Sequence, residues 1–236
     1  MINISAQTKE ILFQQLALID ISVPSIGEGR TTEHCERWSI CRLMATIFID
    51  QDFKFPIKLV KRERPDFCLH TSSNQIGIEV TEAIQPDYAR ARVLPEAGLD
   101  ESILDPSLFK WGAPEKSLKE LRSIASEKKL TGPGWDGEEI EVEWSTAIFD
   151  TIKKKSAKLI SKGFKKYNEN WLSIYDNANS FAIDIDISIS IIAKELSKYW
   201  SNESFDKIYV ETGKLIIEIS NGAVKKIPLN DLWKNK

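Results

Sequence analysis

Two short apolar segments joined by a polar turn are the strongest structural signal in this sequence. Residues 66–83 read DFCLHTSSNQIGIEVTEA, and the central TSSN has the composition of a tight turn. The pattern predicts a β-hairpin with Asp66 at the start of its first strand and Glu79 within its second. Glu79 lies between Ile78 and Val80, in a strand that is otherwise apolar. The question is what this carboxylate faces.

The two acidic residues can meet across the hairpin. Side chains alternate faces along a strand, and residues opposite each other on paired strands are close. Two carboxylates that close repel unless a proton or a cation lies between them. Mg²⁺ suits such a pair because it takes a few carboxylate ligands and keeps its waters, and it can activate water and stabilise charge on a phosphoryl group. Asp66 and Glu79 are therefore candidate ligands of Mg²⁺ or Mn²⁺. Two other interpretations stay open: Asp66 as a turn residue after Pro65, and Glu79 as an edge-strand or ion-paired residue.

Apolar periodicity predicts the elements around the hairpin. A helix over 32–50, capped by Thr31 or Thr32, precedes a strand within 55–63, and a long helix over 145–168 is followed by a strand over 171–176. The remaining expected elements are a helix over 6–19, a helix over 115–128, a helix over 188–199, and three strands within 207–229. Together they predict an α/β (α+β) fold in which helices flank a central mixed sheet. We expect a single domain, 1–236, with a core at 32–176, an insertion at 84–144 and an extension at 177–236.

Composition excludes some classes and leaves others open. The chain has 236 residues, with 32 Lys and Arg against 35 Asp and Glu, so net charge gives no argument for a nucleic-acid partner. Three cysteines and two histidines make a structural zinc site implausible and favour reduced thiols in the cytoplasm. No apolar run approaches the length of a membrane span, and the first residues lack the pattern of a secretory signal.

The order of elements and the hairpin together resemble the PD-(D/E)xK nuclease superfamily. Pro65-Asp66 and then Glu79-Val80-Thr81 on the following strand correspond to its motif. The family core runs helix, three strands, helix, strand, and residues 32–176 have that order. The resemblance implies a restriction-endonuclease-like core, Mg²⁺ or Mn²⁺ at Asp66 and Glu79, and hydrolysis of phosphodiester bonds in DNA.

One position departs from the family's pattern, and two others fit it. The motif lysine is replaced by Thr81, which carries no charge. Many members place a glutamate on the first core helix, and Glu36 lies in register with the apolar stripe of helix 32–50. Some members supply the missing group from the following helix. Lys155, aligned with Ile148, Ile152 and Leu159, is our candidate there. Lys153 is the alternative, because we expect it to project into the apolar face of that helix. On that helix Phe149, Ala157, Ile160, Phe164 and Tyr167 are expected to share an apolar face.

Plainer interpretations remain beside these. Glu36 in a first helical turn favours the helix dipole whatever else it does. The lysine-rich helix face is either solvated or a DNA-binding surface. Arg90 and Arg92 are either ordinary loop residues or phosphate ligands. At the level of function, the alternatives to a metal-dependent DNA nuclease are a decayed module of the same fold that binds nucleic acid or a protein, and a regulatory α/β protein.

Overall fold

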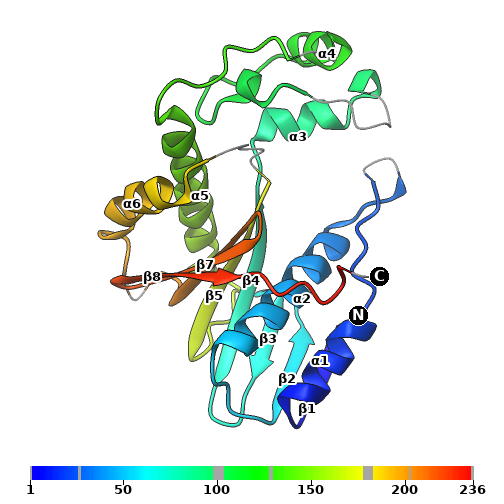
Figure 1. The fold of residues 1–236 in the computed structure, drawn as a ribbon, viewed down its shortest axis with the longest axis vertical. Helices are drawn as coiled ribbons and strands as arrows, with labels where there is room; N and C mark the ends of the chain where they lie inside the picture. Colours follow the sequence, from blue (N-terminus) through cyan, green and yellow to red (C-terminus); the bar gives the residue numbers. More distant parts are fainter. Residues whose placement is uncertain are drawn as a thin grey trace.

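One mixed sheet organises the chain in the computed structural model, which describes residues 2–25, 28–97, 104–127, 130–177, 183–201 and 203–234. Within these ranges eight strands lie side by side in chain order (Figure 1). β4 runs parallel to β5 and β5 to β6, and the other neighbours are antiparallel. The strands are β1 (Asn3–Ala6), β2 (Ile57–Lys61), β3 (Phe67–His70), β4 (Gln75–Ala83), β5 (Glu169–Asp176), β6 (Lys207–Thr212), β7 (Leu215–Ser220) and β8 (Ala223–Pro228).

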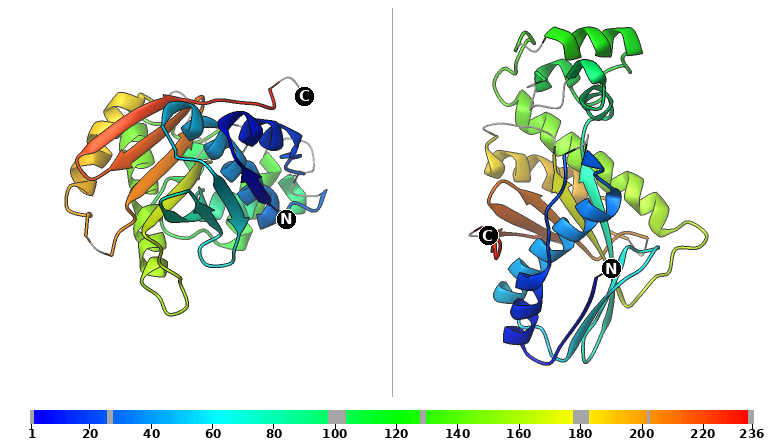
Figure 2. Two further views of the ribbon diagram at one scale, coloured as in Figure 1. Left: turned by 90° about the horizontal axis from the view of Figure 1, so that it is seen from below. Right: turned by 90° about the vertical axis from the view of Figure 1, so that its right-hand side faces the viewer.

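Helices cover both faces of this sheet, which confirms the predicted fold class. α1 and α2 pack on one face, and α5 and α6 pack on the other (Figure 2). α3 and α4 lie beyond one end of the sheet with an apolar cluster of their own. The helices are α1 (Lys9–Leu18), α2 (Thr32–Asp50), α3 (Pro86–Arg92), α4 (Leu118–Glu127), α5 (Glu139–Leu159) and α6 (Ile185–Leu196), with 3₁₀ turns at Pro95–Ala97 and Pro106–Phe109. No helix in the part of the chain that the structure describes is long and apolar enough to cross a bilayer.

The predicted hairpin is confirmed. β3 and β4 are antiparallel neighbours, and Phe67 lies opposite Ile78. Their turn is closed by the N–H of Thr71, which donates to the carbonyl of Asn74 at 2.9 Å, while the Thr71 hydroxyl accepts from the Asn74 N–H at 3.0 Å. β4 is longer than β3, so its second half, to Ala83, pairs only with β5.

α2 begins and packs as its sequence indicates. The N–H of Thr31 donates to Nδ1 of His34 at 3.0 Å, which satisfies a donor at the helix start. Its apolar residues, including Ile40 and Ile47, are buried against the sheet. The C-terminal segment is fastened across the same helix: Arg42 Nε contacts Glu211 Oε1 at 2.8 Å, and its Nη1 contacts Asp231 Oδ2 at 2.9 Å. Burial raises the pKa of Glu211 to about 6 despite Arg42.

The bounds predicted for the long helix, 145–168, are wrong at both ends. α5 begins at Glu139, because the acidic residues of its first turn favour a helix N-terminus. It ends at Leu159, and Gly163 then adopts φ +94°, which turns the chain away. The apolar face predicted from Phe149 to Tyr167 is therefore also wrong, and Ile160 is 54% exposed. The buried stripe contains Ile148, Ile152 and Leu159, which share a core cluster.

Two other regions correct the sequence-based assignment. Residues 3–6, before the predicted first helix, form the edge strand β1, and α1 starts only at Lys9 after its cap Thr8. The insertion was expected to hold one helix, but α3 precedes α4, with Pro86 in its first turn and Gln85 as its cap. Residue 128, the expected end of the helix at 115–128, lies outside the described residues.

Candidate functional site

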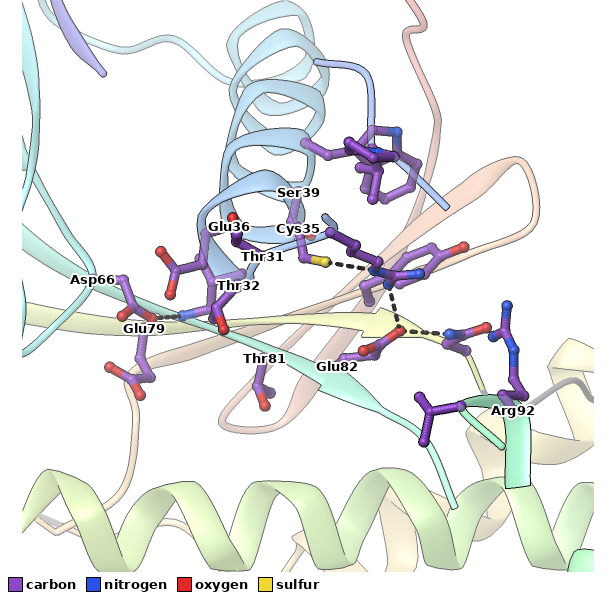
Figure 3. A pocket seen from close by; sticks show the side chains of 18 of the residues that line it. Thr31, Thr32, Cys35, Glu36, Ser39, Asp66, Glu79, Thr81, Glu82 and Arg92 are labelled. Carbon is purple, nitrogen blue, oxygen red and sulfur yellow. Dashed lines mark hydrogen bonds and ion pairs between the residues drawn. The ribbon is translucent and has the colours of Figure 1, made fainter. Parts of the chain in front are cut away.

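Asp66 and Glu79 come together where β3 begins and β4 continues past it. Asp66 immediately precedes β3, and its Oδ2 accepts a hydrogen bond from the backbone N–H of Val80 at 2.7 Å. Beyond Ile78, β4 no longer pairs with β3, and the Asp66 carboxylate accepts the hydrogen bond that the Val80 N–H could otherwise donate to that strand. Figure 3 shows Asp66 and Glu79 beside each other at the wall of a cleft, with Glu36 facing them from α2.

Lys155 makes the closest contact to Glu79. Its Nζ lies 2.7 Å from Glu79 Oε1 and donates at 3.2 Å to the backbone carbonyl of Val80. Both partners are largely buried, with side chains 14% and 8% exposed. Lys155 belongs to α5, which lies on the opposite side of the site from Glu36. It follows Ile148 and Ile152 along the buried stripe of that helix. A helical residue in such a stripe must point to the sheet.

Glu36 faces the same cleft, as expected, and its partner is a second lysine. Lys61 Nζ forms an ion pair with Glu36 Oε2 and lies 3.9 Å from Asp66 Oδ1. Lys61, the last residue of β2, was not among the residues predicted for the site. It pairs with Phe67, the residue after Asp66, but this register between β2 and β3 follows from no local pattern in the sequence.

The three carboxylates exceed the two ammonium groups in charge. Burial and the neighbouring charge of Glu79 raise the pKa of Asp66 to about 6, and Glu36 adds to the effect. The Val80 N–H and Lys61 act in the opposite direction and offset only part of it. A buried carboxylate held at that pKa near other acids is a typical property of functional sites. The site therefore favours an additional proton or cation.

The oxygen donors suit a magnesium ion held mainly by water and substrate. Asp66 Oδ2 accepts from the Val80 N–H, Asp66 Oδ1 lies 3.9 Å from Lys61 Nζ, and Glu79 Oε1 contacts Lys155. A divalent cation would offset the excess negative charge of the site. Mg²⁺ is commonly held by one or two carboxylates. Among the described residues there is no group of three or more His, Cys, Asp or Glu that could hold a metal ion. The fit thus extends to a two-carboxylate site and not to a closed protein cage.

The remaining candidates lie in different places. Thr81 lines the cleft two residues after Glu79, where it presents a neutral hydroxyl. Lys153, the alternative to Lys155, is wrongly assigned to the apolar face: its side chain is 55% exposed and pairs with Asp150 at 2.7 Å. Arg90 pairs with Asp87 and Glu115 in the insertion, whereas Arg92 lines the cleft.

The cleft extends from the carboxylates to the insertion. It has a volume of about 2020 Å³, and residues of α2, β4, α3 and α5 line it. Farther along, Arg30 Nη2 and Asn177 Nδ2 contact Glu82 Oε1 at 3.4 and 2.5 Å (Figure 3). Tyr88 and Leu94 form an apolar wall on the insertion side. The cleft therefore joins an acidic site, a polar middle and an apolar end.

Comparison of the chain with protein-family models, with curated proteins and with solved structures finds no match.

Proposed function

We propose that this chain is a metal-dependent nuclease that hydrolyses phosphodiester bonds in DNA, with Asp66, Glu79 and Lys155 at its reaction centre. The observation that carries the proposal is the Lys155 ammonium 2.7 Å from Glu79, beside Asp66 with its raised pKa. Lys155 brings to the motif the positive charge that Thr81 lacks. The order α2, β2, β3, β4, α5, β5 agrees with the core order of the PD-(D/E)xK superfamily.

Each residue has a separate task in this proposal. Mg²⁺ held by Asp66 and Glu79 would supply an activated water and charge stabilisation at the phosphoryl group. The Val80 N–H keeps Asp66 oriented, and Lys155 keeps Glu79 oriented. Lys155 also places a fixed positive charge where negative charge develops on the phosphate during attack. Glu36 holds Lys61 near Asp66.

The size of the cleft favours a macromolecular substrate. Sites for small ligands usually measure roughly 300–1,000 Å³, and this cleft has about 2020 Å³. Lys158 and Arg92 also line it and can contact phosphates outside the reaction centre. A polynucleotide passing through the cleft would reach both the carboxylates and the apolar wall of the insertion.

A cytoplasmic location goes with this proposal. Cys35, Cys41 and Cys68 are all free thiols, as suits a reducing compartment. Burial raises the pKa of Cys41 to about 12, which keeps that thiol unreactive.

A decayed module that binds DNA or a protein is the second candidate. Two features favour it. Glu79 and Glu36 pair with lysines inside the protein, and Thr81 carries no charge where the family has a lysine. In that case the lysines take the place of the metal, and the cleft retains binding without chemistry.

Cleavage assays with a panel of substrates separate the two candidates. Purified protein is incubated with end-labelled single-stranded DNA, double-stranded DNA and RNA, each with Mg²⁺, Mn²⁺ or EDTA. We expect DNA cleavage with Mg²⁺ or Mn²⁺ and none with EDTA, and Glu79→Gln should lose it while remaining folded. Binding of DNA without cleavage under any of these conditions would favour the decayed module. Cleavage that persists in Glu79→Gln would place the chemistry elsewhere.

A further inference from the structure

A second hollow adjoins the cleft next to the Asp66 side of the site. It has a volume of about 480 Å³ and is lined by Arg62, Glu63, Arg64, Gly163, Lys165 and Tyr167. We call it the basic groove, because it gathers three cations around one carboxylate. Glu63 and Arg64 line both the groove and the cleft, so the two hollows adjoin each other at these residues.

Among the described residues, Arg62, Arg64 and Lys165 form no ion pair, whereas Lys153 and Lys155 on the preceding helix do. Their field reaches neighbouring groups: the pKa of His70 is lowered by burial and then by the charges of Arg62, Lys58 and Lys165. Exposed like charges held together in one hollow attract a polyanion from solution.

The groove has a defined shape because two loops are fastened to each other and to the sheet. The N–H of Lys165 donates to the carbonyl of Arg64 at 3.3 Å. Tyr167 and Pro65 pack on Gly77 of β4, where a Cβ would lie 2.7 Å from Tyr167 Cδ2 and 2.9 Å from Pro65 Cγ. The Lys165 ammonium lies over the Tyr167 ring, 4.8 Å from its centroid. The loop that carries Asp66 therefore also positions the groove.

We propose that the basic groove binds the phosphate backbone of a nucleic acid strand where that strand leaves the cleft, so that the enzyme grips its substrate beyond the bond it cuts. This inference rests on the proposed function for the identity of the polyanion. The groove adjoins the cleft at Glu63 and Arg64, and an extended backbone supplies one negative charge per nucleotide along such a path. With a divalent cation at Asp66 and Glu79, as proposed above, the strand bound in the groove can also reach the reaction centre.

Binding measured without chemistry tests the groove. Fluorescence anisotropy with a labelled oligonucleotide in EDTA gives the affinity at a series of salt concentrations. The variant Arg62→Gln/Lys165→Gln removes two charges that line the groove and not the cleft. The control Lys194→Gln/Lys198→Gln removes the same charge from exposed positions on and just after α6. We expect the groove variant to bind roughly tenfold or more weakly, with a salt slope smaller by about 1.4–1.8, and the control to match wild type.

The length of the oligonucleotide adds a second readout. A trinucleotide confined to the cleft should bind the groove variant and the control alike, while a longer strand should distinguish them. Equal affinities for the long strand would overturn the groove proposal even if the protein cuts DNA. Loss of binding by the groove variant in a protein that never cuts would retain the groove and overturn the nuclease. The groove proposal would also be overturned if an acidic peptide at matched charge concentration displaced the oligonucleotide and the groove variant bound short and long oligonucleotides as the control does.

Discussion

Asp66→Asn should abolish cleavage and at the same time make the metal-free protein more stable near pH 7. Asparagine can still accept the hydrogen bond from the Val80 N–H, but it removes the charge that repels Glu79 and Glu36. The pKa of Asp66 is about 6 in the folded protein against an ordinary value of 3.8. The folded state therefore holds this proton more tightly than the unfolded state does. Ionisation of Asp66 lowers the free energy of unfolding as pH rises from about 4 to 6, and the penalty is complete above that range.

The expected sizes follow from the same contacts. One pKa unit corresponds to about 1.4 kcal/mol, so we expect a gain of roughly 1–3 kcal/mol in the unfolding free energy near pH 7. The gain should shrink below pH 6 as wild-type Asp66 takes up its proton. Cleavage should fall by at least about 10²–10³-fold, since a charged group at the reaction centre is lost. Urea unfolding at several pH values and single-turnover cleavage measure the two effects.

Asp105→Asn is a control with the opposite expected sign. Asp105 is also buried, but hydrogen bonds from Gly132 and Ser107 outweigh the burial and lower its pKa. Its charge contributes stability above the unfolded pKa, so the asparagine variant should lose stability near pH 7. If Asp66→Asn lost stability in the same way, contacts within the fold would already stabilise the charged Asp66 carboxylate, and no cation would be needed there.

Lys155→Met should reduce the cleavage rate at saturating DNA by roughly 10²–10⁴-fold, the range for loss of one positioned catalytic group. Methionine keeps much of the packing beside Ile152 and Leu159 but leaves the Glu79 carboxylate buried without its partner. Breaking such a pair destabilises a protein by about 3–5 kcal/mol when fully buried, and somewhat less here because both side chains retain some exposure. Measuring the rate at saturating substrate separates a slower cleavage step from weaker binding of DNA.

Two further variants separate chemistry from stability at Lys155. In Lys155→Met/Glu79→Gln no charge remains unpaired, so stability should return while cleavage stays lost. Lys153→Met removes an exposed lysine from the same helix, 2.7 Å from Asp150, and should change the rate little. Similar small losses for Lys153→Met and Lys155→Met would mean that the helix contributes only general positive charge. Lys155 would then have no specific role in the proposed reaction.

Local patterns were enough to find the hairpin, the helix Thr32–Asp50 and Lys155, because each depends on residues a few positions apart. Lys155 follows from helical spacing once Ile148 and Ile152 are assigned to the buried face. Lys61 could not be found in this way. Its contacts to Glu36 and Asp66 require α2 to pack over the end of β2, and that packing joins segments that no spacing rule relates.

The errors in element bounds have similar causes. The apolar residues after Leu159 continue a helical pattern, yet Gly163 at φ +94° and the Lys165–Arg64 backbone contact direct the chain into a loop. β1 has only four residues, and its pairing with β2 decides its structure. Tertiary pairing overrides local preference in short segments of this kind.

Binding of Mn²⁺ to the metal-free protein shows whether Asp66 and Glu79 form a metal site, since it requires neither the right substrate nor turnover. Electron paramagnetic resonance near pH 7 counts the free ion as protein is added. We expect a single Mn²⁺ site per chain that is lost in both Asp66→Asn and Glu79→Gln and retained in Asp105→Asn. Equal uptake by wild type and the two site variants, or no uptake by wild type with DNA present, would contradict a metal centre at Asp66 and Glu79.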